Sequence, residues 1–141
     1  MGFSVAAAYA IIGVSFLISL EILTGSMLPA LTNVDESYNS LFDRKIEGIQ
    51  TSINISKVSV EMYNSNYNHS ITIKNIGKIT LKTNEMIVLI NGLLQDFESE
   101  YIYFYPGESI LLNVSDVSGD GNQRLKIITY NGISDYYSYY I

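Results

Sequence analysis

The 141-residue sequence contains no cysteine and no tryptophan, only two prolines, and few basic side chains, with 8 Lys and Arg against 14 Asp and Glu. Without cysteine the chain cannot form disulfides, Cys-ligated zinc sites or a thiol nucleophile. The chain has a net charge of −6 and lacks the excess of basic side chains that binds phosphate backbones, so we expect no nucleic-acid partner. Charged residues make up 16% of the chain, below the roughly 25% of ordinary soluble domains. This shortage of charge is concentrated at the amino terminus.

The amino-terminal segment is apolar and has the length of a membrane span. No charged side chain precedes Glu21, and residues 3–20 form one uncharged run. A helix over this run spans roughly 27 Å, close to the about 30 Å of a bilayer core. A cleaved signal peptide and a buried soluble helix are the alternatives, but no basic residue precedes the run and no clear cleavage site follows it. We therefore expect an uncleaved transmembrane anchor over residues 1–31, with Glu21 near the far interface.

Residues 32–56 show a helical period with charges between the apolar positions. The apolar stripe consists of Val34, Tyr38, Leu41 or Phe42, Ile46, Ile49 and Ile53. Asn33 and Glu36 have capping-box spacing, and Pro29 is expected to break or kink a helix arriving from the membrane. These residues predict a helical spacer. Its stripe either pairs with a second subunit in a homodimer or packs against the following domain.

From residue 57 to residue 141 the apolar period shifts to two, which predicts half-buried strands. Ile71 and Ile73 alternate with polar residues, for example, and Asn91-Gly92 suits a tight hairpin turn. Residues 63–70 are polar and predict a loop that contains the only histidine, His69. Seven or eight short strands at this spacing predict an all-β antiparallel sandwich.

Three N-glycosylation sequons follow the apolar segment, at Asn54-Ile-Ser56, Asn68-His-Ser70 and Asn113-Val-Ser115. Asn-rich and Ser-rich chains produce such triplets by chance, so each one alone is a weak signal. All three lie on the same side of the anchor. Together they favour a carboxy-terminal portion outside the cell.

Several segments along the whole chain resemble those of one protein family. They are the opening MGFSVAAAYAIIGVSFLISLEIL, then ITIKNIGKITL, VLINGLL, YPGES and the closing KIITYNGISDYYSYY. With the helical spacer between anchor and β-domain, they resemble the F and G accessory proteins of the archaellum, the archaeal swimming filament, and the opening is more similar to F (FlaF). The resemblance implies a stator with an immunoglobulin-like sandwich beneath the S-layer. It also implies binding to S-layer protein and cooperation with a G-type accessory protein.

Tyrosine supplies the candidate contact surface. Alternation places Tyr101, Tyr103 and Tyr105 on one face of a strand, with Ile102 and Phe104 on the other. Because a two-layer sandwich gives each strand only one core face, an all-aromatic strand must present some rings to solvent or to a partner. The three tyrosines are therefore either a partner interface or ordinary amphipathic surface residues.

The sequence offers little for chemistry, so we expect no enzyme, no cofactor and no metal site. One histidine without cysteine cannot build the usual zinc site. Residues 116–121 resemble the start of a calcium loop, but Ile127 stands where the bidentate Glu belongs, which favours a hairpin loop. A filament subunit, pilin or archaellin, is the alternative function. Such precursors carry a basic segment before the processing glycine, whereas only Met1 precedes Gly2.

Overall fold

The computed structural model describes residues 2–141 and divides into two compact units, with the boundary between Asp43 and Arg44. The first unit is helical. The second contains the end of the helix and all of the strands.

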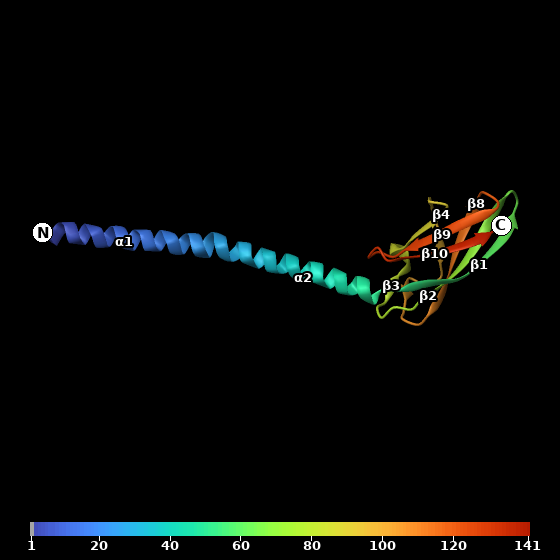
Figure 1. The fold of residues 1–141 in the computed structure, drawn as a ribbon, viewed down its shortest axis with the longest axis horizontal. Coiled ribbons are helices and arrows are strands. Elements are labelled where there is room, and N and C mark those ends of the chain that lie inside the picture. The colour runs from blue at the N-terminus through green and yellow to red at the C-terminus, as the bar shows by residue number, and fades with distance from the viewer. Residues whose placement is uncertain (1) are drawn as a thin grey trace. The chain divides into compact units, whose positions relative to one another are not determined.

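Three helical elements run end to end, namely α1 (Gly2–Ile22), the π-helical η1 (Leu23–Met27) and α2 (Leu28–Gln50) (Figure 1). The amino-terminal part is apolar on all sides and is long and apolar enough to cross a membrane. The hydroxyls of Ser15, Ser19 and Thr24 donate to backbone carbonyls four residues earlier at 2.8–2.9 Å. Because these bonds satisfy the hydroxyls inside the helix itself, the segment is compatible with a hydrocarbon environment.

Of the break or kink expected at Pro29, the break does not occur, because Pro29 lies inside the first turn of α2. The chain widens into the π-helical turn just before it, where the Leu28 amide donates to the carbonyl of Leu23. Such a turn accommodates the proline, whose ring would clash with the carbonyl four residues earlier in a regular helix. The capping box predicted at Asn33 and Glu36 is also wrong, because the helix runs through both residues.

The spacer ends earlier than the predicted residue 56. Helix α2 stops at Gln50, and Thr51 closes it by donating through its amide and its hydroxyl to the Glu47 carbonyl at 2.9 and 2.8 Å. Strand β1 (Ile53–Tyr63) begins directly afterwards. Ile53 therefore belongs to the buried core of the strands and not to the apolar stripe of the helix.

Eight strands form two four-stranded antiparallel sheets, which confirms the sandwich. The first sheet has the order β1-β2-β8-β6, with β2 (Asn66–Asn75), β8 (Ser109–Val117) and β6 (Glu98–Ser99). The second has the order β10-β9-β4-β5, with β10 (Ser134–Tyr140), β9 (Asn122–Ile128), β4 (Ile87–Ile90) and β5 (Leu93–Gln95). These orders match strands A-B-E-D and G-F-C-C′ of the immunoglobulin-like sandwich.

A short ribbon completes the fold. It pairs β3 (Leu81–Lys82) with β7 (Tyr103–Phe104), and the 3-10 turn η2 (Thr83–Glu85) follows β3. Leu81 and Phe104 are paired in the ribbon, and both are fully buried. The ribbon therefore contributes two residues to the core, and alternating residues of the two sheets supply the rest. That core consists of Ile53, Ile55, Ile71, Ile73, Leu81, Met86, Val88, Ile90, Phe104, Ile110, Leu112, Val114, Val117, Leu125 and Ile127.

The predicted loop over residues 63–70 is wrong. Strand β1 continues to Tyr63, a tight turn with Asn64 at φ 57° follows, and β2 begins at Asn66. The predicted turn at Asn91-Gly92 is confirmed, with φ of 51° and 84°. The hairpin loop predicted at residues 116–121 is wrong, because β8 and β9 belong to different sheets and the chain crosses from one sheet to the other there.

Within the unit of residues 44–141, the end of α2 is held against the loops that follow β2 and β9. The Lys78 amide donates to the Gln50 carbonyl at 2.8 Å, and the Ile76 amide to the Ser52 carbonyl at 3.0 Å. Gly77, between them, approaches so closely that a Cβ would lie 2.6 Å from the Gln50 carbonyl oxygen. On another side, the Tyr130 hydroxyl donates to Glu47 Oε2 at 3.2 Å. Burial and then the Glu47 charge raise the pKa of Tyr130, so its hydroxyl stays protonated and keeps donating.

Candidate partner interface

The three predicted tyrosines lie together on the surface, in the segment of residues 101–105, which we call the tyrosine segment. Tyr101, Tyr103 and Tyr105 are 56%, 53% and 52% exposed. Phe104 between them is fully buried, because β7 pairs it with Leu81 and directs it into the core. The alternation predicted for Tyr103 and Phe104 is therefore confirmed.

The prediction for Ile102 is wrong. Only Tyr103 and Phe104 are in a strand, and Ile102, expected on the core face, is 61% exposed. The chain bends before β7, so period two does not extend back to residue 102. As a result the tyrosine segment presents four large apolar or aromatic side chains to solvent where the sequence predicted three.

The backbone of the tyrosine segment is fixed from inside the domain. Thr83 donates through its hydroxyl to the Tyr101 carbonyl at 2.6 Å and through its amide to the Ile102 carbonyl at 2.9 Å. Buried Asn75 donates through Nδ2 to the Phe104 carbonyl at 3.0 Å. At the far end, Glu108 accepts the Tyr105 amide at 3.1 Å. Each bond uses a backbone group, which leaves the tyrosine rings available for contact.

The rings border a shallow hollow of about 390 Å³ that Glu108, Ser109 and Ile110 complete. The Tyr103 and Tyr105 rings stand 6.5 Å apart between centroids and are tilted by 33°. Large amphipathic rings held on a fixed backbone bury much area on binding at a small cost in side-chain entropy. The arrangement therefore suits contact with another protein.

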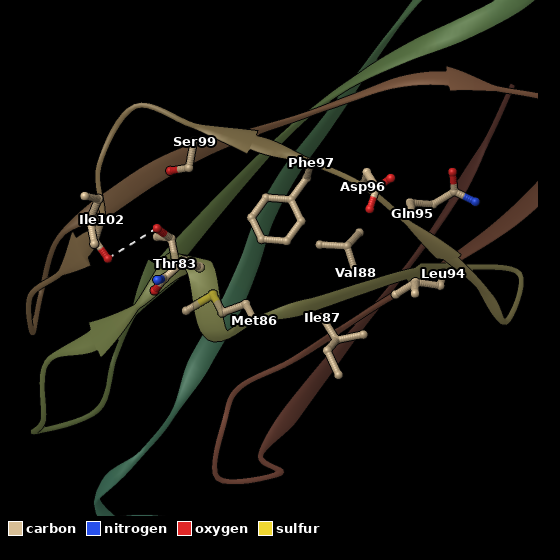
Figure 2. Close-up of a pocket in the computed structure, with 11 residues that line it drawn as sticks. Thr83, Met86, Ile87, Val88, Leu94, Gln95, Asp96, Phe97, Ser99 and Ile102 are labelled. Carbon is tan, nitrogen blue, oxygen red and sulfur yellow. Dashed lines mark hydrogen bonds between the residues drawn. The ribbon is translucent and has the colours of Figure 1, made fainter.

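A second pocket is lined by residues of η2, β4, β5 and β6, and Ile102 of the tyrosine segment borders it (Figure 2). The Phe97 ring points toward Val88 and Met86, and the hydrogen bond from Thr83 to Ile102 closes one end (Figure 2). Its volume is about 390 Å³, within the range of small-molecule sites. The lining contains a single carboxylate, Asp96, and no histidine or lysine. No acid and base converge there for catalysis.

The sequence reasoning missed an aromatic and cationic cluster on the second sheet. The Arg124 guanidinium carbon and the Lys126 Nζ lie 4.6 and 5.0 Å from the centroid of the Tyr136 ring. A hydrogen bond and charge from Lys126 lower the pKa of Tyr136. Across the sheet, Lys126 pairs with Leu89 of β4, and Leu89 pairs with Leu94 of β5, so these two leucines extend the cluster. The alternation of Arg124 and Lys126 in β9 places both cations on one face of the strand, which the sequence could have indicated. Only the strand register shows that Tyr136 of β10 lies beside them.

His69 is buried and not in a loop. It lies on the inward face of β2, and its ring meets the edge of Tyr139 at 5.5 Å between centroids. Among residues 2–141, neither its ring nitrogens nor the Tyr139 hydroxyl has a hydrogen-bond partner of good geometry. Burial lowers the pKa of His69 below its usual 6.5, and the backbone of Tyr67 offsets only part of that effect. Burial also raises the pKa of Tyr139 to about 12. This pair packs as neutral rings in the core.

The three sequon asparagines lie on strands of the first sheet, with Asn54 on β1, Asn68 on β2 and Asn113 on β8. Asn54 and Asn113 are exposed, and Asn68 is half-buried. Asn54 and Asn68 lie more than thirty residues before the tyrosine segment, and Asn113 follows it by eight residues.

No protein-family model and no curated protein matches this chain.

Proposed function

We propose that the protein is a non-enzymatic stator, or surface-anchoring component, of the archaeal motility machinery. In this proposal the amino-terminal helix anchors it in the cytoplasmic membrane and its sandwich binds S-layer protein outside the cell. The observation that carries the proposal is the tyrosine segment, held on a fixed backbone at the surface of a domain that is joined to a membrane-compatible helix.

Two features support an anchor that bears load. Residues 2–22 form an apolar helix whose interior hydroxyls are satisfied by its own carbonyls. The end of α2 is held by Lys78 and Ile76 on one side and by Tyr130 on another. A stator must resist torque, so several bonds between the end of the helix and the sandwich suit the role better than a flexible linker would.

The partners proposed besides S-layer protein are a G-type accessory protein and a second copy of this chain. The apolar stripe of α2 supports a homodimer, because Val34, Tyr38 and Phe42 are all exposed. Within residues 44–141, Ile49 is 77% exposed and so does not pack on the sandwich. This favours the pairing alternative over packing against the following domain.

Co-isolation tests the proposal most simply. The full chain, reconstituted in lipid nanodiscs, is incubated with purified S-layer protein and recovered. We expect S-layer protein to be enriched over nanodiscs that carry an unrelated immunoglobulin-like sandwich on a transmembrane helix. Equal recovery on both would contradict the proposed function.

The alternative function, a pilin-like or archaellin-like filament subunit, is favoured by one observation. An apolar helix that continues directly into a β-domain is also the architecture such subunits need to pack helices in a filament core. Sheared filaments distinguish the two functions. The stator proposal predicts that the chain stays in the membrane fraction, whereas a filament subunit would appear among the sheared filaments with a processed amino terminus.

A further inference from the structure

The three sequon asparagines share one surface, which the sequence alone does not show. In β1, Asn54 lies between buried Ile53 and Ile55 and so faces outward. In β2, Asn68 precedes buried His69, and in β8, Asn113 lies between buried Leu112 and Val114. All three therefore lie on the outer face of the β1-β2-β8-β6 sheet, which we call the sequon face.

Two of the sequons run side by side in opposite directions. Ser70, the hydroxyl residue of the Asn68 sequon, is the direct cross-strand partner of Asn113. Its hydroxyl donates to Asn113 Oδ1 at 3.2 Å. The Asp116 amide donates to Asn68 Oδ1 at 3.3 Å. Both amide groups are thus oriented through their oxygens by neighbouring strands.

In the part of the folded chain that the structure describes, the amide nitrogens make no hydrogen bond, so the folded domain can carry a glycan on each without losing one. Among residues 2–141, no hydrogen-bond acceptor meets the Nδ2 atom of Asn54, Asn68 or Asn113. Asn75 shows the contrast, because it lies on the inward face of β2, is fully buried, and uses Nδ2 in two hydrogen bonds. An asparagine on that face could not carry a bulky group without disrupting the core.

We propose that Asn54, Asn68 and Asn113 carry N-linked oligosaccharides, so that the sequon face is covered by glycan. The proposal rests on the external location assigned above. The donor is an oligosaccharide linked through phosphate to a membrane lipid, supplied with its transferase by the cell. A bond forms between Nδ2 and the anomeric carbon of the first sugar while the bond from that carbon to the phosphate oxygen breaks. The lipid phosphate leaves with the electron pair, and Nδ2 loses one proton to a base of the transferase.

Transfer precedes pairing of the strands. In the folded sheet the Asn68 and Asn113 sequons are extended and adjacent, so a transferase reaches each more easily before β2 and β8 meet. The finished sheet then only has to accommodate the products. It does so because the neighbours on this face are small or solvent-exposed, such as Ser59 opposite Ser70 and Glu98 opposite Asn113.

A covered sequon face restricts where proteins can bind. Attached glycans are bulky and hydrated, so this face is closed to close protein contact. The tyrosine segment and the outer face of the β10-β9-β4-β5 sheet carry no sequon. The second of these faces presents the cluster of Arg124, Lys126 and Tyr136. Glycosylation would therefore direct partners to the tyrosine segment and to the surface that bears Tyr136.

Glycopeptide mass spectrometry of the full chain, purified from its native membranes, tests the proposal. We expect all three asparagine-containing peptides to carry an added oligosaccharide mass. The variants Ser56→Ala, Ser70→Ala and Ser115→Ala should each lose only the glycan of their own sequon, although the asparagine itself is retained. Ser59→Ala, on the same face but outside any sequon, is the matched control and should leave all three glycans in place.

A membrane-impermeant lysine reagent, applied to intact cells, separates this proposal from the proposed location. Three unmodified asparagines on a chain whose Lys57 and Lys126 are labelled from outside would overturn the glycan proposal alone. Three unmodified asparagines on a chain that stays unlabelled would overturn both the glycan proposal and the external location.

Discussion

The Nδ2 atom of Asn75, a side chain with no exposed surface, donates to the backbone carbonyl of Phe104 at 3.0 Å and to that of Ile79 at 2.9 Å. Its Oδ1 accepts the Gly77 amide at 3.0 Å. One buried amide thus connects β2, the loop that touches the end of α2, and the strand that carries Tyr103. The surface proposed to bind a partner and the attachment of the helix share this support.

Replacing Asn75 with alanine should lower the free energy of unfolding by about 3 kcal/mol, because buried carbonyl and amide groups lose their partners. Urea unfolding of residues 44–141, which contain the complete core, measures the change. Asn84→Ala is the matched control, since Asn84 lies in the η2 turn and its side chain is exposed to solvent. An Asn75 variant as stable as the Asn84 variant would refute the supporting role.

Gly77 is predicted to be intolerant of any side chain. A Cβ would lie 2.6 Å from the Gln50 carbonyl oxygen and 2.6 Å from the Ser52 amide nitrogen, so Gly77→Ala must displace backbone. We expect a loss of about 1–3 kcal/mol in unfolding free energy. Gly48→Ala is the control, because nothing lies within 4 Å of its Cβ position and alanine favours helix by up to about 1 kcal/mol. Equal stabilities of the two variants would show that the end of α2 is not held at Gly77.

His69 should make the domain sensitive to acid. Its pKa is lowered in the folded state, so below the unfolded value of 6.5 the unfolded chain binds more protons than the folded one. The stability contributed by neutral His69 is complete above pH 6.5 and is lost as the pH falls through 6.5 toward the lower pKa of the folded state. Replacing His69 with phenylalanine should flatten this dependence in urea unfolding measured across pH 4–8, a range of about four units around the usual histidine pKa.

Tyr139→Phe provides the control for that experiment. It keeps a ring beside His69 and removes a buried hydroxyl that has no partner among residues 2–141. The variant should be at least as stable as the natural chain and should retain the acid dependence. If His69→Phe shows the same loss of stability below pH 6.5 as Tyr139→Phe, carboxylates elsewhere cause the acid sensitivity.

Much of the sandwich could be predicted because its inward positions are aliphatic. Ile71 and Ile73 in β2, for example, alternate with polar residues, and both are fully buried. The start of β2 was not predicted because Tyr67 and His69 occupy its inward positions. A hydropathy pattern identifies a strand by aliphatic side chains at such positions. Ile53 was misplaced for a related reason, since it continues the helical spacing of α2 by coincidence and the helix ends three residues before it.

The candidate interface was predictable only in part. Alternation of aromatic residues placed Tyr103 outward and Phe104 inward, and the pairing with Leu81 bears this out. The role of Asn75 was not predictable, because its three hydrogen bonds join residues up to 29 positions away. The common face of Asn54, Asn68 and Asn113 likewise depends on which strands become neighbours. Strand order between distant segments is set by packing of the whole core, which local sequence patterns do not encode.

The affinity of the full chain for S-layer protein, measured with nanodisc-held wild type and variants, tests the central claim most directly. The triple variant Tyr101→Ser, Tyr103→Ser and Tyr105→Ser should bind at least about tenfold more weakly, because aromatic anchors dominate interface energies. The matched control replaces Tyr63 and Tyr140, which are 66% and 77% exposed, with serine and should bind like wild type. A triple variant with an intact fold and unchanged affinity would contradict the account.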